Sequence, residues 1–171
     1  MQRTHEAQNP PPLAQVDVVI GIVLRDDGHV LVCQRRDGGH LGGYWEFPGG
    51  KREPGESLER CLLRELQEEL AIHVRPLTAL DIIEHQYPAV RVRLHPYLCA
   101  HVAGTPQPIG CQRVEWVAAT QLGDFRFPPA NDALIADLIR RLSGSTPEDA
   151  GRRPAVLISD LPDHKVPPSG D

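Results

Sequence analysis

Three glutamates are the first residues of this chain whose types and spacing suggest chemistry: Glu65, Glu68 and Glu69. At positions i, i+3 and i+4 of one helical segment, their side chains project from neighbouring points. On a helical wheel of about 100° per residue, Glu65 and Glu69 fall on the arc that carries the leucines of the segment, whereas Glu68 falls to one side. Those leucines are Leu58, Leu62, Leu66 and Leu70. Carboxylates in such a partly buried place repel one another, so they require a proton, a basic partner or a cation.

A divalent cation is the simplest partner for these carboxylates. Arg64 supplies one positive charge, which is too little for three glutamates. A hard ion with oxygen ligands, most simply Mg²⁺, meets the need; it also keeps several waters and binds phosphate groups. Just upstream, Gly49 and Gly50 let the backbone approach a ligand closely and offer carbonyl oxygens. The residues alone therefore indicate a metal site, with a solvated charged helix face as the alternative.

A longer pattern extends from Gly50 to Ile72. Gly50 is followed after five residues by Glu56, and after seven more by the run Arg64-Glu65-Leu66-Gln67-Glu68-Glu69-Leu70-Ala71-Ile72. This closely resembles the signature Gx5Ex7REUxEExGU of Nudix hydrolases, in which U is an aliphatic residue. Every specified position matches except that Ala71 stands where the signature has glycine. If a positive φ is required there, alanine is a costly residue.

The resemblance implies a metal-dependent hydrolase that cleaves a nucleoside diphosphate linked to another group. The residues implied to hold Mg²⁺ or Mn²⁺ are Glu65, Glu68, Glu69 and the Gly50 carbonyl. Glu56 and Arg64 would orient these ligands. A metal ion would bridge phosphate oxygens and lower the pKa of a bound water, with Glu65 as the favoured catalytic base and Glu68 as the alternative.

Around the signature, residues 16–142 resemble the MutT-type 8-oxo-dGTP diphosphatases. The likeness is carried by Arg35-Arg36, by Glu46-Phe47-Pro48-Gly49-Gly50-Lys51 and by Phe127-Pro128-Pro129-Ala130-Asn131. It implies that Asn131 reads the edge of the oxidised guanine, for which an amide offers both a donor and an acceptor. The alternative is that Asn131 only caps the helix that follows.

Further substrate contacts follow from the same resemblance. Arg36 would bind sugar or phosphate and Phe47 would flank the base; the alternatives are a solvated strand end and a core aromatic. The full set of predicted substrate-binding residues is Arg35, Arg36, Phe47, Gly49, Lys51 and Asn131.

Two segments depart from the MutT pattern. The turn Tyr87-Pro88-Ala89-Val90 keeps an aromatic residue before proline, but the two residues after that pair differ. Near residues 109–112, where MutT-like enzymes place an additional metal-binding glutamate, this chain has no acid before Glu115. That role is vacant or is taken by Gln112 or Glu115.

These observations support three hypotheses. The leading one is a pyrophosphohydrolase that converts 8-oxo-dGTP to 8-oxo-dGMP and pyrophosphate and so sanitises the nucleotide pool. The second is a broader enzyme of the same family, acting on CTP, methylated dCTP or another nucleotide. The third is a non-catalytic module that recognises 8-oxoguanine, although such modules lack the intact set of carboxylates that this chain keeps.

The elements that must position these residues can be predicted from hydrophobic periodicity and turn residues. We expect strands at 16–24, 29–34, 72–87, 90–102 and 114–117, and helices at 57–70 and 130–142. Turns are expected at 25–28, where Gly28 accepts a positive φ, and at 88–89; Ser57 is the expected helix N-cap. Hairpins combined with two helices predict an α+β fold, and the resemblance specifies a Nudix-type α/β/α sandwich with a mixed sheet between helices.

Composition and net charge exclude some classes of protein. The chain has 171 residues, 40% of them apolar, and a formal charge of −5, which excludes a fibrous chain and a nucleic-acid coat protein. We therefore expect no duplex nucleic acid as partner, and the resemblance implies a nucleoside triphosphate instead. The four cysteines lie far apart and are expected to be free thiols.

The domain organisation predicted from composition is one domain with two tails. The domain spans 16–142, preceded by a polar flexible tail at 1–15 and followed by a tail at 143–171 that is partly disordered or docked through Ala155–Ile158. No apolar run approaches the roughly 20 residues of a membrane span, so no membrane contact is expected. We expect a cytoplasmic protein that is a monomer or a weak dimer.

Overall fold

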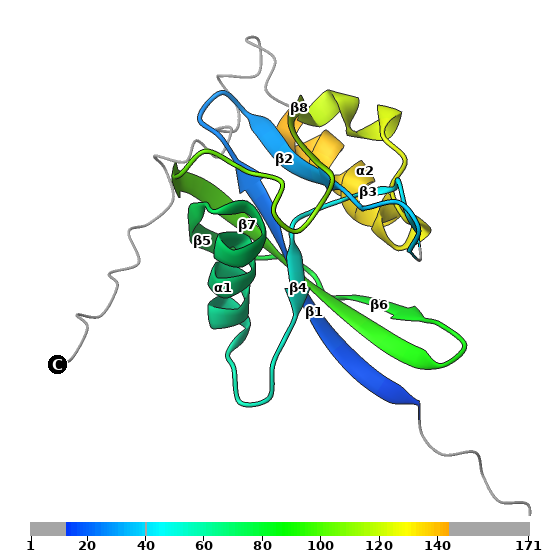
Figure 1. The fold of residues 1–171 in the computed structure, drawn as a ribbon. Helices are drawn as coiled ribbons and strands as arrows, with labels where there is room; N and C mark the ends of the chain where they lie inside the picture. The colour runs from blue at the N-terminus through cyan, green and yellow to red at the C-terminus, as the bar shows by residue number, and fades with distance from the viewer. Residues whose placement is uncertain (1–12, 40, 144–171) are drawn as a thin grey trace, which may run out of the picture.

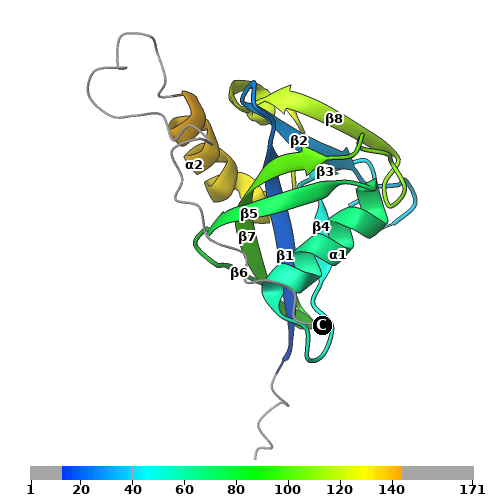
Figure 2. The same ribbon diagram turned by 90° about the vertical axis from the view of Figure 1, so that its left-hand side faces the viewer.

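A mixed sheet lies between two helices, as the computed structural model shows for residues 13–39 and 41–143 (Figure 1). Helix α1 (Leu58–Leu70) covers one face of the sheet and helix α2 (Asp132–Ser143) lies on the other (Figure 2). The predicted α+β sandwich is therefore confirmed.

The strands of the sheet mostly follow the predicted ranges. They are β1 (Ala14–Leu24), β2 (His29–Gln34), β3 (Trp45–Glu46), β4 (Gly49–Lys51), β5 (His73–Ala79), β6 (Ile83–Gln86), β7 (Val90–Ala103) and β8 (Arg113–Ala118). The sequence did not predict β3 and β4, because glycine and proline dominate this stretch and both disfavour strands.

Strand β1 is the centre of the sheet and changes partners along its length. It runs parallel to β7 from Ala14, opposite Val90, to Leu24, opposite Ala100. On its other side it pairs with β2 at Leu24 and with β4 from Val18 to Ile20. The sheet therefore divides on that side, so that β3, which pairs with β2, and β4, which pairs with β1, belong to different branches.

The predicted strand 72–87 is wrong as a single element, because it forms β5 and β6 with a break between them. Both strands pair with β7, with Ala79 opposite Tyr97 and Ile83 opposite Leu94. Four steps along one chain thus match three along the other, so one residue must bulge out of the ladder. Leu80 keeps one bond across the break, from its amide to the Pro96 carbonyl.

The two helices bury alternate side chains of β1. Leu62 and Leu66 of α1 pack with Val19, and Leu138 of α2 packs on the other face with Ile20. As predicted, the Ser57 hydroxyl caps α1 by accepting a hydrogen bond from the Arg60 amide. Helix α2 begins later than predicted, because residues 129–131 form a 3₁₀ turn before it.

Helix α1 ends at Ala71 in the left-handed conformation, with φ 56°. The Ala71 amide donates to the Gln67 carbonyl and the Ile72 amide to the Leu66 carbonyl, which is the closing pattern that usually has glycine at this position. Ala71 is therefore strained in its backbone conformation, as expected for an alanine at a position where the signature has glycine.

Replacing Ala71 with glycine should raise the free energy of unfolding by about 1 kcal/mol, because glycine adopts this conformation without the Cβ clash. Urea denaturation measures the change. Ala133→Gly is the matched control, since Ala133 is exposed in α2 and its replacement should cost about 0.5–1 kcal/mol. An Ala71→Gly variant no more stable than the parent would contradict the strain.

The predicted tails lie almost wholly outside the described residues, as does Ala155–Ile158. Strand β1 starts at Ala14, earlier than the predicted strand 16–24. Within residues 13–39 and 41–143, neither helix is long and apolar enough to cross a membrane.

Candidate active site

Two of the three carboxylates of α1 face the sheet and the third faces solvent, as the helical wheel predicted. The Glu65 side chain is 13% exposed, whereas that of Glu68 is 60% exposed. Glu69 is also partly buried. Glu65 and Glu69 therefore form the inner pair of the cluster and Glu68 its outer edge.

Arg64 forms ion pairs with three carboxylates, although its single positive charge cannot neutralise all of them. Its guanidinium lies 2.9 Å from Glu56, 2.9 Å from Glu65 and 3.2 Å from Glu68, and it also donates to the Lys51 carbonyl at 3.3 Å. The hydrogen bond from Arg64 lowers the pKa of Glu56 to about 2, and the same bond raises the pKa of Arg64. Glu56 and Arg64 thus stay ionised and can act as the orienting pair that was predicted.

Glu69 has no ion pair with Arg64 among the residues described. Burial, together with the negative charges of Glu65 and Glu46, raises its pKa to about 7, despite the lowering effect of a hydrogen bond from the Gly49 amide. The carboxyl group therefore takes up a proton near neutral pH unless a cation replaces the proton.

The glycines before α1 allow β4 to approach these carboxylates. A Cβ on Gly50 would lie 2.2 Å from Cδ of Glu65, and one on Gly49 would lie 2.0 Å from the Val19 carbonyl oxygen. The Gly50 carbonyl lies 3.8 Å from the Cys61 thiol, so it is directed toward α1. Backbone atoms therefore require glycine at position 49, whereas a side chain at position 50 would displace the Glu65 carboxylate.

The donor set fits a hard cation that keeps part of its water shell. Glu65, Glu69 and the Gly50 carbonyl offer oxygen ligands, and Mg²⁺ binds few protein groups and retains waters. In the described part of the chain, no three Asp, Glu, His or Cys side chains are arranged to hold a metal on their own. Solvent and substrate oxygens would therefore complete the coordination.

Glu115 cannot supply the additional acid. On β8, Val114 and Trp116 pack toward α1, so Glu115 between them projects from the opposite face, where it pairs with Arg113. The segment that reaches Glu69 is instead at Gly110, where a Cβ would lie 2.8 Å from Cγ of Glu69. Gln112 is exposed.

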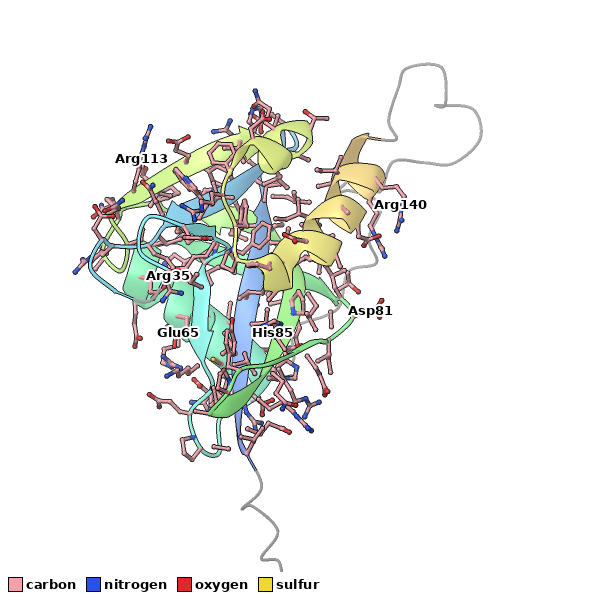
Figure 3. All side chains as sticks on the ribbon, turned by 90° about the vertical axis from the view of Figure 1, so that its right-hand side faces the viewer. Arg35, Glu65, Asp81, His85, Arg113 and Arg140 are labelled. Carbon is pink, nitrogen blue, oxygen red and sulfur yellow. The ribbon has the colours of Figure 1, made fainter. Side chains whose placement is uncertain are left out.

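Glu46 is a neighbour of the cluster to which the sequence assigned no role. It pairs with Arg35 at 2.9 Å, and burial raises its pKa despite that partner. Its neighbour in β3 is Trp45, which is buried on the α2 side, so Glu46 faces the α1 side because successive side chains of a strand face opposite ways. Arg35, predicted to bind substrate, is thus engaged with Glu46 and lies on the same side of β1 as Glu65 (Figure 3).

The other predicted substrate-binding residues lie in different parts of the domain, some exposed and some in the core. Arg36 donates to the Ile109 carbonyl at 2.7 Å, and Lys51 is exposed. Phe47 is 3% exposed and its ring centroid lies 5.1 Å from that of Phe127, which makes it a core aromatic on the α2 face. Asn131, four residues after Phe127, is 8% exposed.

Comparison with known proteins agrees with this geometry. The NUDIX domain family matches residues 19–137. The chain is a Nudix hydrolase. Its relatives include the 8-oxo-dGTP diphosphatase of Escherichia coli, 31% identical over 75% of this chain and 99% of that protein. A putative 8-oxo-dGTP diphosphatase 2 of Mycobacterium tuberculosis is 37% identical over 80% of this chain and 96% of its own length.

Solved structures show the same fold. A MutT structure from Aliivibrio salmonicida or Vibrio cholerae aligns with a TM-score of 0.62 at 31% identity, covering 73% of this chain and 96% of that one. The Escherichia coli ORF135 protein aligns with a TM-score of 0.68 at 30% identity, covering 80% and 96%.

The raised pKa of Glu69 predicts how the stability of this Nudix hydrolase depends on pH without metal. Between the ordinary value of 4.5 and about 7, the folded protein holds a proton that the unfolded chain releases. The folded state therefore binds more protons, so the free energy of unfolding falls as pH rises through this window. Denaturation in EDTA across the window should show a decline that Glu69→Gln removes. An unchanged decline in that variant would contradict the assignment.

Proposed function

We propose that this Nudix hydrolase converts a nucleoside triphosphate and water to a nucleoside monophosphate and pyrophosphate, with 8-oxo-dGTP as preferred substrate and Mg²⁺ or Mn²⁺ as cofactor. The observation that carries the proposal is the inner pair Glu65 and Glu69 against Gly49 and Gly50. Its biological role would be to sanitise the nucleotide pool and so protect DNA.

The metal would neutralise phosphate charge and lower the pKa of an attacking water. Glu65 is the favoured base, because Arg64 holds its carboxylate at 2.9 Å and only 13% of the side chain is exposed. Arg64 is itself fixed by Glu56, so the arginine that holds the base is in place before substrate arrives. Glu69, ionised when a cation replaces its proton, would be a metal ligand together with the Gly50 carbonyl and Glu68.

Asn131 is the group proposed to read the base. It is one of two buried polar residues in the described part of the chain, and its side chain makes no hydrogen bond to the described residues. The capping alternative lacks support for the same reason, since no capping bond from its side chain to α2 is found among those residues. A free amide donor and acceptor suit the edge of a purine that carries an oxo group.

The test is a comparison of kcat/KM for 8-oxo-dGTP, dGTP, CTP and ADP-ribose with Mg²⁺ present, because specificity is a ratio of these values. We expect the highest value for 8-oxo-dGTP, the monophosphate and pyrophosphate as products, and no turnover in EDTA. In ¹⁸O water, label in inorganic phosphate would contradict pyrophosphohydrolysis.

CTP is the alternative substrate within the same chemistry. A relative in Escherichia coli named CTP pyrophosphohydrolase is 30% identical over 80% of this chain and its full length. A higher kcat/KM for CTP than for 8-oxo-dGTP would replace the leading substrate and leave the reaction unchanged.

A further inference from the structure

A buried acid–base pair lies on the α1 side of the sheet, outside the carboxylate cluster. Nε2 of His95 lies 2.9 Å from Oδ1 of Asp17, and the two side chains are only 8% and 17% exposed. His95 stands opposite Val19 in the β1–β7 ladder and Asp17 is two residues before Val19, so both face the same side as that core residue. Among the described residues, His95 and Asn131 are the buried polar side chains, and the proposed chemistry uses only Asn131.

The second oxygen of the Asp17 carboxylate binds the residue that follows β4. Nη2 of Arg52 donates to Oδ2 at 3.0 Å, and the Arg52 amide donates to the Asp17 carbonyl, also at 3.0 Å. Arg93 lies 3.9 Å from Oδ1 and 3.5 Å from Glu84. The hydrogen bond from His95 lowers the pKa of Asp17, so the carboxylate stays ionised and accepts from both sides. Asp17 therefore holds Arg52 by its backbone and by its side chain.

One peptide group joins Asp17 to the arginine beside the proposed catalytic base. The N–H of the peptide between Lys51 and Arg52 donates to the Asp17 carbonyl, and the carbonyl of the same peptide accepts from Nη2 of Arg64 at 3.3 Å. Because a peptide group is planar, a rotation that weakens one of these bonds also changes the other. Arg64 in turn lies 2.9 Å from Glu65.

The loop 52–56 returns to the same arginine at its far end. The Glu53 amide donates to the Glu56 carboxylate and the Glu56 amide to the Glu53 carbonyl, each at 3.2 Å. Nε and Nη2 of Arg64 donate to the Glu56 carboxylate at 2.9 and 3.0 Å. Figure 2 shows this loop at the same end of the sheet as the start of β1. Arg64 thus contacts both ends of the loop, and Asp17 holds the first of them.

We propose that Asp17 is a positioning residue for hydrolysis, which fixes the start of the loop 52–56 and thereby the place of Arg64 beside Glu65. The inference rests on the proposed function, because it concerns the same base. His95 binds one oxygen of the Asp17 carboxylate and so directs the other oxygen toward the loop. Asp17 itself touches neither the base nor the other glutamates of α1 among the contacts described.

The position of these bonds separates this role from simple support of the sheet. Strand β4 ends at Lys51, which pairs with Val18. The bonds between Asp17 and Arg52 therefore lie beyond the ladder, on the first residue of the loop. The Arg52 side chain is 42% exposed, so it covers little of the core. A contact at this place orders the loop more than it stabilises the strand pairing.

The test is a double-mutant cycle on the full chain, with steady-state rates for 8-oxo-dGTP and Mg²⁺. Asp17→Ala and Arg52→Met should each lower kcat by about 10- to 100-fold and leave KM within about twofold, as for residues that orient a ligand without touching substrate. The double variant should lose no more than the stronger single variant, because both changes break the same contact. Arg52→Lys, which keeps the charge, should recover most of the rate.

Glu84→Gln is the matched control, since Glu84 is 59% exposed and its described ion pair is with Arg93, outside the loop. It removes a carboxylate from the edge of the same charged group and should leave kcat unchanged. If Asp17→Ala does not fold, Arg52→Met carries the test, because it replaces a side chain that is partly in solvent.

The Arg64 side chain gives a readout that needs neither turnover nor metal. Its Nε proton, bonded to Glu56, should give a sharp ¹⁵N-correlated NMR signal, assigned by its loss in Arg64→Lys. Arg52→Met should shift or broaden this signal, and Glu84→Gln should not. A folded Arg52→Met protein with the parental kcat, or with a lower kcat and an unchanged Arg64 signal, would overturn the proposal. If the parent did not hydrolyse 8-oxo-dGTP, the proposed substrate would fail, while the Arg64 signal would still decide whether the Asp17–Arg52 contact positions that arginine.

Discussion

Glu65→Gln should lower kcat by about 10²- to 10⁴-fold, the range in which a general base contributes, while the protein stays folded. Glutamine has nearly the same shape and can still accept the hydrogen bond from Arg64 Nη1. It removes the negative charge and the proton acceptor beside Gly50, and with them a proposed ligand of the metal. Steady-state rates with 8-oxo-dGTP and Mg²⁺, with a circular dichroism spectrum as the test of folding, measure the effect.

Glu59→Gln is the matched control, because Glu59 is exposed in the first turn of the same helix and should be replaceable without loss of turnover. Glu68→Gln separates the two candidate bases. As a proposed metal ligand, Glu68 should also be needed for turnover, but only loss of the true base should flatten the acidic limb of the pH dependence of kcat/KM. A folded Glu65→Gln variant that keeps most of its activity would rule out the assignment.

Gly49→Ala should destabilise the protein by at least about 3 kcal/mol, because the added methyl group overlaps backbone rather than a movable side chain. The new Cβ would lie 2.0 Å from the Val19 carbonyl oxygen and 2.8 Å from Cα of Ile20. The φ of 149° at Gly49 is also one that residues with a side chain rarely adopt. Strand β4 would have to leave β1, and Gly50 would leave Glu65 with it.

Urea denaturation measures this loss, and Gly39→Ala is its control. A Cβ added at Gly39 would meet nothing within 4 Å among the described residues, and Gly39 does not have a positive φ, so its replacement should change stability little. Equal stability of the two variants would show that β4 can move away from β1 at low cost. That result would also remove the steric reason for glycine before α1.

Local periodicity was sufficient to predict which carboxylates of α1 face the sheet. Glu65 and Glu69 follow the leucine arc because a helix fixes side-chain direction from residue to residue. N-cap residue preference predicted the Ser57 cap, and the departure from the signature pointed to the strain at Ala71. Arg64 was harder, since its contact with Glu56 depends on how the loop before the helix folds back, and no periodicity encodes that.

Features that depend on strand partners could not be predicted. Glu46 reaches the cluster because β3 pairs with β2, and Glu115 faces away because of the register of β8 against the same strand. A one-residue change of register would exchange the faces, and the sequence of either strand alone does not set it. Phe47 was placed beside the base by resemblance, whereas its contact with Phe127 places it in the core.

The parallel pairing of β1 with β7 determines when the site can form. Ala14 finds its partner only at Val90, so β1 must wait for most of the domain to be synthesised before its ladder with β7 closes. Such distant contacts slow folding and leave apolar strands exposed in the meantime. Since β4 pairs with β1, the glycines beside Glu65 reach their final positions late in synthesis. A nascent chain halted before β7 would therefore contain every residue of the signature but would lack the β1–β7 pairing that completes the sheet.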